Sequence, residues 1–185
     1  MATGTMRGQA RAAILRAAVS EFTSHGIRAV SADRVMADAG VSKVTFYRHF
    51  PTKDDLVVAY LEAELDRVQR AVADAGEGAT PGQWSAALAE EICRPGFRGC
   101  PFINAAAEYA DPDHAVREVV ARFRAWMIGA ITAALVSRGV AEPERVARQV
   151  MMLRDGALVE GYVSGDPDRV AAELSAGVDA LVAAA

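Results

Sequence analysis

Residues 31–53 read SADRVMADAGVSKVTFYRHFPTK, and this stretch decides how the first part of the chain folds. Ser31 and Ser42 are both favourable helix N-caps, because a serine hydroxyl can accept a hydrogen bond from a backbone N–H of the first helical turn. Gly40 stands between the two predicted helices and can take the left-handed conformation that ends a helix. Two short helices joined by a tight glycine turn indicate a helix-turn-helix.

The second of these helices, over residues 43–49, has two distinct faces. Val35, Val41, Phe46 and Phe50 are predicted to point inward and to set the angle between the two helices. The outward face combines cations, a hydroxyl, a phenol and an imidazole, which can donate to phosphates and meet base edges in a major groove. It consists of Lys43, Val44, Thr45, Tyr47, Arg48 and His49. An ordinary solvated basic helix is the alternative interpretation of this face.

Charge is distributed unevenly along the chain. Residues 1–53 carry eight Lys and Arg against three Asp and Glu, a net charge of +5, whereas the remainder carries a net charge of −9. A basic module joined to an acidic body is expected when only one end of a protein meets phosphate.

Residues 40–56, GVSKVTFYRHFPTKDDL, resemble the signature of the tetracycline-repressor (TetR) family of regulators, and the similarity extends over about the first sixty residues. The resemblance implies a homodimeric repressor that reads a double-stranded DNA operator with the helix over residues 43–49. It also implies that a C-terminal domain binds a small molecule, the effector, which releases the DNA. We therefore expect a helix-turn-helix domain over residues 1–52 and a helical effector-binding and dimerisation domain over residues 53–185.

The resemblance also implies roles for individual residues. Lys43, Val44, Thr45 and Arg48 would face bases, and Tyr47, His49 and Lys53 would hold phosphates. Ser31 and Ser42 would add contacts at the N-termini of their helices. Two positions depart from the family pattern, since Val44 stands where glycine is frequent and Met36 where alanine is common. The first departure alters the expected operator preference, and the second alters packing between the first two helices.

Hydrophobic periodicity predicts an all-α fold of about nine helices, with no β-strand signal. A Gly-containing linker is expected over residues 76–82 and a Gly/Pro-punctuated loop over residues 94–101. The predicted helices span residues 7–25, 31–38, 43–49, 53–75, 83–93, 102–109, 113–138, 142–163 and 168–184.

The last two predicted helices offer apolar faces with small residues, and the resemblance implies that they pair with their counterparts in a four-helix dimer interface. Periodicity alone does not say what covers an apolar face, so an intramolecular core is the alternative. The residues concerned are Val146, Val150, Leu153, Ala157, Leu158, Val170, Leu174, Gly177, Val178 and Leu181.

Residues 99–109, GCPFINAAAEY, are similar to a segment that enters the helix bordering the effector cavity in one branch of the family. An apolar cavity with few polar groups suits a small, largely apolar effector, whereas plain core packing is the alternative for each aromatic residue. Arg124 and Arg154 are further polar candidates. The predicted pocket comprises Trp84, Phe97, Cys100, Phe102, Asn104, Tyr109, Phe123, Trp126, Met127, Met151 and Tyr162.

Nothing in the sequence indicates an enzyme. His25, His49 and His114 are widely separated, no glycine-rich phosphate loop is present, and no Ser or Cys stands beside a recognisable acid–base partner. The carboxylates Glu90, Glu91, Glu108 and Asp111 are interpreted as solvated helix faces rather than metal ligands. We therefore expect no catalytic residues, no metal and no cofactor.

The longest uncharged stretch, residues 125–137, is shorter than the roughly 20 residues that a membrane-spanning helix needs. No secretory signal is recognisable, so a cytoplasmic protein without membrane contact is expected. Cys93 and Cys100 are too few for a disulfide framework and are interpreted as reduced thiols. Two alternatives stay open, a DNA-binding factor that works without an effector and a thiol sensor that acts through Cys100.

Overall fold

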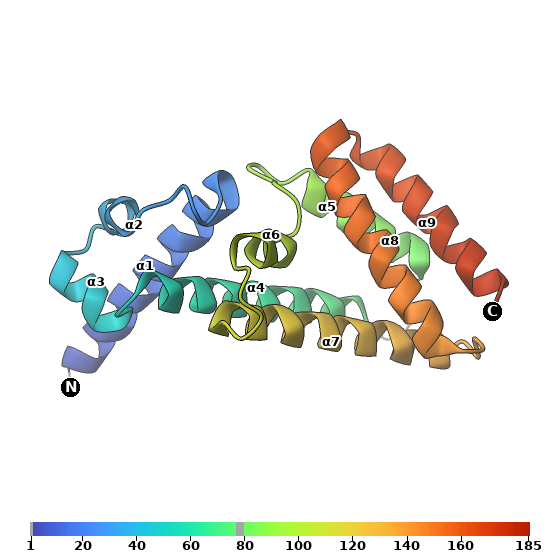
Figure 1. Ribbon diagram of the computed structural model, residues 1–185, viewed down its shortest axis with the longest axis horizontal. Coiled ribbons are helices and arrows are strands. Elements are labelled where there is room, and N and C mark those ends of the chain that lie inside the picture. The colour runs from blue at the N-terminus through green and yellow to red at the C-terminus, as the bar shows by residue number, and fades with distance from the viewer. Residues whose placement is uncertain (1, 77–79) are drawn as a thin grey trace. The chain divides into compact units, whose positions relative to one another are not determined.

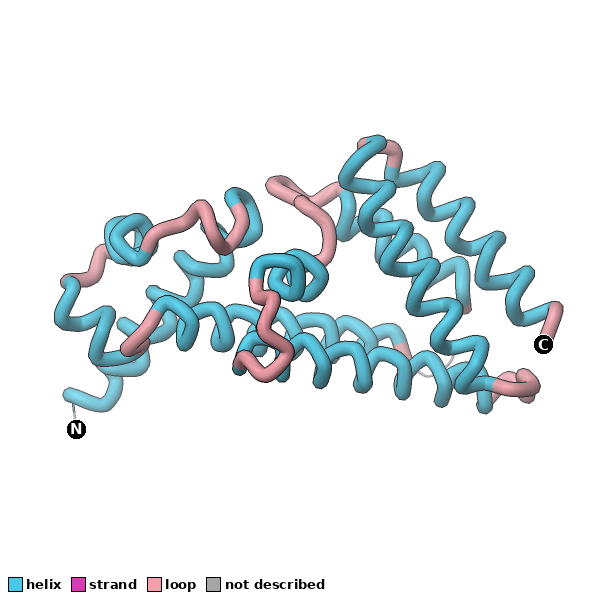
Figure 2. The backbone as a smooth tube through the Cα atoms, in the orientation of Figure 1, coloured by secondary structure: helices cyan, strands magenta, loops and turns pink. Residues whose placement is uncertain are grey.

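The computed structural model describes residues 2–76 and 80–185, and the side chains of residues 8–76, 80 and 82–185. This part of the chain contains nine helices and no strand (Figures 1 and 2). The all-α prediction is therefore confirmed. The helices are α1 (Ala2–His25), α2 (Ala32–Ala39), α3 (Lys43–His49), α4 (Lys53–Ala75), α5 (Pro81–Ile92), α6 (Pro101–Glu108), α7 (Ala115–Val136), α8 (Pro143–Ser164) and α9 (Pro167–Ala183).

Helix α5 begins two residues earlier than predicted, because a capping box precedes it. The Thr80 hydroxyl accepts from the Gln83 N–H at 3.3 Å, and the Gln83 side chain accepts from the Thr80 N–H at 2.7 Å. Pro81 fits the first helical position, where its missing N–H would have no intrahelical partner. The linker expected over residues 76–82 is therefore shorter, and residues 77–79 lie outside the described residues.

Helix α7 is four residues shorter than the helix predicted over residues 113–138. At its N-terminus, Nδ1 of His114 accepts a hydrogen bond from the Val116 N–H at 3.2 Å, so His114 acts as the cap. At its C-terminus, the chain turns through Gly139, which has a φ of +71°. Both ends are decided by local hydrogen bonds that hydrophobic periodicity does not reveal.

The chain forms two compact units that interleave in sequence. Unit 1 comprises Met1–Asp66 with Pro101–Val120, and unit 2 comprises Arg67–Cys100 with Ala121–Ala185. Helices α4 and α7 each begin in unit 1 and end in unit 2. The short helix α6 and the loop after it thus belong to the same unit as the helix-turn-helix, although almost fifty residues separate the two in sequence.

The core of unit 1 is aromatic and aliphatic. Phe46 and Phe50 are fully buried, and Phe22 packs edge-on against Tyr60 with ring centroids 5.4 Å apart. Burying each such ring stabilises the fold by about 1.5 to 3 kcal/mol relative to an exposed ring. Met36 is also buried, so it belongs to this core.

In unit 2, helices α5, α8 and α9 pack against one another. Helices α5 and α8 approach closely at Gly161 of α8, where a Cβ would stand 2.5 Å from Cδ1 of Ile92 in α5. Several residues that the sequence placed in a dimer interface are instead buried within the chain itself, as the intramolecular alternative expects. These are Val146, Val150, Leu158, Val170 and Val178.

Helix α7 is long and apolar enough to span a membrane by length and composition, with a mean hydropathy of 1.6 in its most apolar 18-residue window. A third of that window is buried within the fold, and core helices of globular proteins pass the same test. Arg124 of α7 makes a 2.7 Å ion pair with Asp155 of α8 in unit 2. This contact is typical of a helix packed within a folded domain.

Candidate nucleic-acid interface

The turn between α2 and α3 is built as the sequence predicts. Gly40 has a φ of +63°, its N–H donates to the Ala37 carbonyl at 3.2 Å, and the Val41 N–H donates to the Met36 carbonyl at 3.1 Å. This is a helix end that requires the left-handed conformation, which glycine adopts without steric cost. The Ser31 hydroxyl caps α2 by accepting from the Arg34 N–H at 3.2 Å.

Helix α3 is about two turns long and depends on its caps and its core contacts. The Ser42 hydroxyl accepts from the Thr45 N–H at 3.2 Å and lies 3.0 Å from the Thr45 hydroxyl. Phe46 anchors the inner face, and the cap residue Phe50 is buried behind it. The Arg11 guanidinium lies over the Phe50 ring, 5.1 Å from its centroid. These contacts hold a short helix with its outer face uncovered.

That outer face carries the residues which the sequence singled out. Lys43, Val44, Tyr47 and Arg48 are exposed, and Val44 is 78% exposed. The Lys43 ammonium lies 6.0 Å from the centroid of the Tyr47 ring, at the outer limit of a cation–π contact. The face therefore presents two cations, a phenol and an apolar side chain together, a combination that suits phosphates and base edges.

The remaining candidates on and after α3 are less accessible. Thr45 and His49 are half-buried, and Lys53 donates from Nζ to the Ile27 carbonyl at 2.6 Å. Partial burial lowers the pKa of Lys53, an effect opposed by the nearby carboxylates of Glu108 and Asp54. One N–H of the Lys53 ammonium is thus used inside unit 1, which leaves two for an outside partner.

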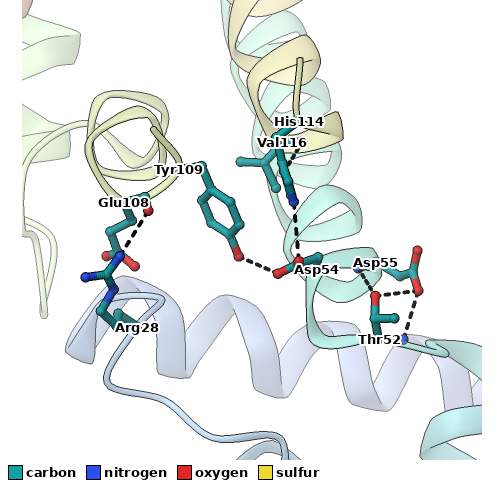
Figure 3. Close-up of polar contacts among 8 residues, drawn as sticks. All are labelled: Arg28, Thr52, Asp54, Asp55, Glu108, Tyr109, His114 and Val116. Carbon is teal, nitrogen blue, oxygen red and sulfur yellow. Dashed lines mark hydrogen bonds and ion pairs between the residues drawn. The ribbon is translucent and has the colours of Figure 1, made fainter. Parts of the chain in front are cut away.

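Sequence reasoning missed the polar cluster that joins the first turn of α4 to the segment between α6 and α7. Asp54 accepts from the Tyr109 hydroxyl at 2.7 Å and faces Nε2 of His114 at 3.3 Å (Figure 3). Nδ1 of His114 accepts from a backbone N–H, so the ring proton is on Nε2 and is directed at Asp54. Nearby, the Arg28 side chain donates to the Glu108 carbonyl at 3.2 Å.

These contacts tie residues 101–120 to the base of the helix-turn-helix. Asp54 lies five residues after His49, the last residue of α3, so the cluster acts close to the end of the outward-facing helix. The sequence alone does not predict this polar cluster. Its members are far apart in the chain, and none of them belongs to a recognisable motif.

The predicted effector residues fall in both units. Phe102, Asn104 and Tyr109 belong to unit 1, and the Tyr109 hydroxyl donates a hydrogen bond to Asp54. In unit 2, Tyr162 is half exposed on α8. The other unit 2 members are more enclosed, either buried (Cys100, Phe123, Met127 and Met151) or half-buried (Trp84, Phe97 and Trp126).

The two arginines named with the pocket meet at one carboxylate of unit 2. Arg124 donates to one oxygen of Asp155 at 2.7 Å, and Arg154 donates to the other at 3.3 Å. The Arg154 guanidinium also lies over the buried ring of Phe123, 5.3 Å from its centroid. Asp155 thus holds both arginines in place within unit 2.

Within the described residues, no group of three or more His, Cys, Asp or Glu is arranged to hold a metal ion. Among the four carboxylates that the sequence analysis weighed as metal ligands, Glu91 forms ion pairs with Arg67 at 3.0 Å and with Arg94 at 2.9 Å. Glu108 and Asp111 lie in unit 1, whereas Glu90 and Glu91 lie in unit 2.

Comparison with known proteins agrees with this geometry. Residues 14–60 match the model of the bacterial regulatory proteins of the tetR family. A TetR-family transcriptional regulator from Streptomyces coelicolor is 36% identical, with a TM-score of 0.86 over 95% of both chains.

Two more distant solved structures share the fold. A putative TetR transcriptional regulator from Streptomyces avermitilis is 24% identical, with a TM-score of 0.76 over 93% of this chain and 97% of that one. A TetR-family regulator from Agrobacterium tumefaciens is 17% identical, with a TM-score of 0.82 over 95% and 99% of the two chains. No curated protein sequence matches the chain.

Proposed function

Because the chain belongs to the TetR family of transcriptional regulators, we propose that it acts as a homodimeric repressor which a small, largely apolar effector releases from a palindromic operator. The observation that carries the proposal is the exposed outer face of α3, with Lys43, Tyr47 and Arg48 held outward on a capped helix-turn-helix. The N-terminal residues of such a helix reach base edges when it lies in the major groove.

The charge distribution supports the DNA-binding role. Residues 1–53 carry a net charge of +5 and the rest a net charge of −9, so attraction to phosphate is concentrated at one end of the chain. Each lysine or arginine that neutralises a phosphate releases a counterion, which makes binding weaken with salt. The acidic remainder would keep the effector-binding part off the DNA. A protein that acts on chromosomal DNA works in the cytoplasm of a bacterium, where we place it.

An exposed apolar stripe on α8 supports the dimer. Met152, Val159 and Val163 are 63, 52 and 73% exposed and lie on one helix face with Gly156, where no atom would meet an added Cβ within 4 Å. Beside this stripe, α8 and α9 form an open apolar groove of about 460 Å³. It is lined by Gln149, Met152, Leu153, Gly177, Ala180 and Leu181. A second copy of this surface would cover both features in a symmetric contact.

The dimer has a direct role in reading DNA. Two recognition helices that lie about 34 to 36 Å apart can enter successive major grooves of a palindrome. Each α3 would then contact one half-site, and the two contacts would add to the affinity without any new type of interaction.

The effector proposal rests on the apolar character of unit 2, where Phe123, Met127 and Met151 are buried and the Arg154 guanidinium lies over the Phe123 ring. The thiol alternative is less favoured, since Cys100 is only 3% exposed and a buried thiol is shielded from reagents. A constitutive DNA-binding factor would have the same α3 face, so effector titration must separate it from a ligand-released repressor.

The first experiment is fluorescence-anisotropy binding to the DNA that flanks the protein's own gene, at two salt concentrations. Lys43→Ala and Tyr47→Ala should each weaken binding about 5- to 30-fold, the loss expected for removing one or two kcal/mol of contact. Wild-type binding should weaken from the lower to the higher salt concentration, because cations that neutralise phosphates release counterions. Arg70→Ala, which removes an exposed cation on α4 in unit 2, is the matched control and should bind as wild type.

The result is clear in either direction. If Lys43→Ala and Tyr47→Ala bind DNA as tightly as wild type, α3 is not part of the interface. If wild type binds no palindromic DNA, the proposed function is wrong. Once an operator is known, titration with a library of small molecules tests release. An affinity that no compound changes would favour the constitutive factor.

A further inference from the structure

Val44 has no packing role in the fold. It is 78% exposed, more than any other large apolar side chain among the described residues. It is the second residue of α3, in the first turn of the helix, and it lies on the outer face with Lys43 and Tyr47. An isopropyl group held in water at this position contributes nothing to the stability of the monomer through burial.

The polar neighbours of Val44 already have partners in the chain. The Thr45 hydroxyl lies 3.0 Å from the Ser42 hydroxyl, and the Lys43 ammonium lies near the Tyr47 ring. Valine cannot donate or accept a hydrogen bond, so any contact that it makes with a base must be apolar. It is β-branched, and in a helix one side-chain rotamer dominates, so its two methyl groups are held in a nearly fixed place.

The major groove offers one apolar feature on the four standard bases, the C5-methyl group of thymine. We propose that Val44 is a specificity-determining residue of the operator contact, and that its methyl groups pack against the C5-methyl of one thymine in each half-site. This inference rests on the proposed function, because it requires α3 to enter the major groove. It goes further by assigning a base and the atoms by which that base is recognised.

The test begins with selection of the operator from random DNA duplexes by the full-length protein. Each thymine of the half-site is then replaced by deoxyuridine, which removes the C5-methyl group and leaves every hydrogen-bonding group in place. One position should respond for each half-site. The expected loss is about fourfold per half-site, the factor that corresponds to burial of one methyl group, and about fifteenfold for both half-sites together.

Two variants identify the side chain responsible. Val44→Ala should bind the thymine and deoxyuridine operators with affinities that agree within about twofold, because the methyl groups that sense the base are gone. Alanine is a better helix former than valine, so α3 is preserved, and a thermal melt checks this. Val136→Ala removes a similarly exposed valine from α7 and should keep the full discrimination of wild type.

Failure of this inference differs from failure of the proposed function. If wild type binds a selected operator but no thymine-to-deoxyuridine replacement weakens binding more than twofold, the Val44 assignment is wrong and DNA binding stands. The same holds if Val44→Ala discriminates as strongly as wild type. If selection yields no operator at all, the proposed function fails and the inference fails with it.

Discussion

A single hydroxyl group joins parts of the chain that lie 55 residues apart. Tyr109 donates to Asp54 at 2.7 Å in a part-buried position, next to the 3.3 Å contact between Nε2 of His114 and the other carboxylate oxygen of Asp54. A hydrogen bond to a charged partner contributes about 1.5 to 3 kcal/mol, and partial exposure places this one at the lower end of that range. The bond stabilises the association of residues 101–120 with the helix-turn-helix inside unit 1.

Tyr109→Phe should therefore lower the free energy of unfolding by about 1 to 2 kcal/mol, because the ring stays while the hydroxyl is lost. Urea denaturation followed by circular dichroism measures this change. Tyr47→Phe removes a hydroxyl from an exposed ring and serves as the control, with an expected change within about 0.5 kcal/mol. Equal stability of Tyr109→Phe and wild type would show that the contact is not formed in solution.

Tyr109 should also make the free energy of unfolding depend on pH in the alkaline range. Burial, followed by the hydrogen bond to Asp54, raises the pKa of Tyr109 well above its ordinary value of about 10. Above pH 10 the unfolded state releases this proton while the folded state keeps it, so the stability from Tyr109 is complete below pH 10 and declines above it. The stability difference between wild type and Tyr109→Phe should shrink between pH 10 and 11.5. A constant difference across that interval would contradict the shifted pKa.

The two cysteines should differ in reactivity. Cys93 is exposed and Cys100 is 3% exposed. Brief treatment of the native protein with iodoacetamide, followed by mass spectrometry of the peptides, should find the adduct on Cys93, because reagents reach Cys100 only after local opening. Both residues should react in urea. Rapid labelling of native Cys100 would revive the thiol-sensor alternative.

At the scale of a single helix, N-caps decide whether α3 is formed. The helix is only about two turns long, which is too short to be stable without caps and tertiary contacts. Ser42 caps α3 as Thr80 caps α5, and each hydroxyl accepts from the backbone N–H three residues on. The two caps are alike in chemistry but lie in different units, which makes them a matched pair.

Ser42→Ala and Thr80→Ala should each lower the free energy of unfolding by about 1 kcal/mol. Ser42→Ala alone should also weaken operator binding, by about fivefold, because a frayed α3 must be re-formed on the DNA. Thermal denaturation and anisotropy titration of both variants test this. An equal loss of DNA affinity in Thr80→Ala would mean that general stability, rather than the form of α3, governs binding.

At the scale of the whole molecule, assembly should control affinity. A Val163→Glu substitution places a charge in the exposed α8 stripe, where a second copy would have to bury it without a partner. We expect wild type to have twice the chain mass by sedimentation and the variant to have the mass of one chain. Operator affinity should then fall about 100-fold or more, since the two half-site contacts are no longer linked.

Val136→Glu is the control for this prediction, because it places the same charge at an exposed valine of α7 outside the α8 stripe. It should leave mass and affinity unchanged. If wild type sediments as a single chain and still binds the palindrome tightly, the proposed mechanism does not need a dimer.

Local sequence signals predict the secondary structure around the site correctly. The bounds of α3 and α4, the caps Ser31 and Ser42 and the left-handed Gly40 agree with the predictions, because each depends on interactions within a few residues. The same local signals underlie the family resemblance, which the comparisons confirm. Periodicity was less successful at the ends of α5 and α7, where capping by Thr80 and His114 sets the boundaries.

The neighbours of these elements depend on long-range packing, which local signals do not encode. Periodicity finds an apolar face but not its cover, so Val150 and Leu158 turned out to be buried in their own chain while Val159 and Val163 remain exposed. The contact of Tyr109 with Asp54 depends on how residues 101–120 pack in unit 1, which no local signal encodes. Hydrogen bonds of caps and turns depend on residues that are close in sequence, so they can be predicted from it. Burial and long-range pairing depend on the whole fold.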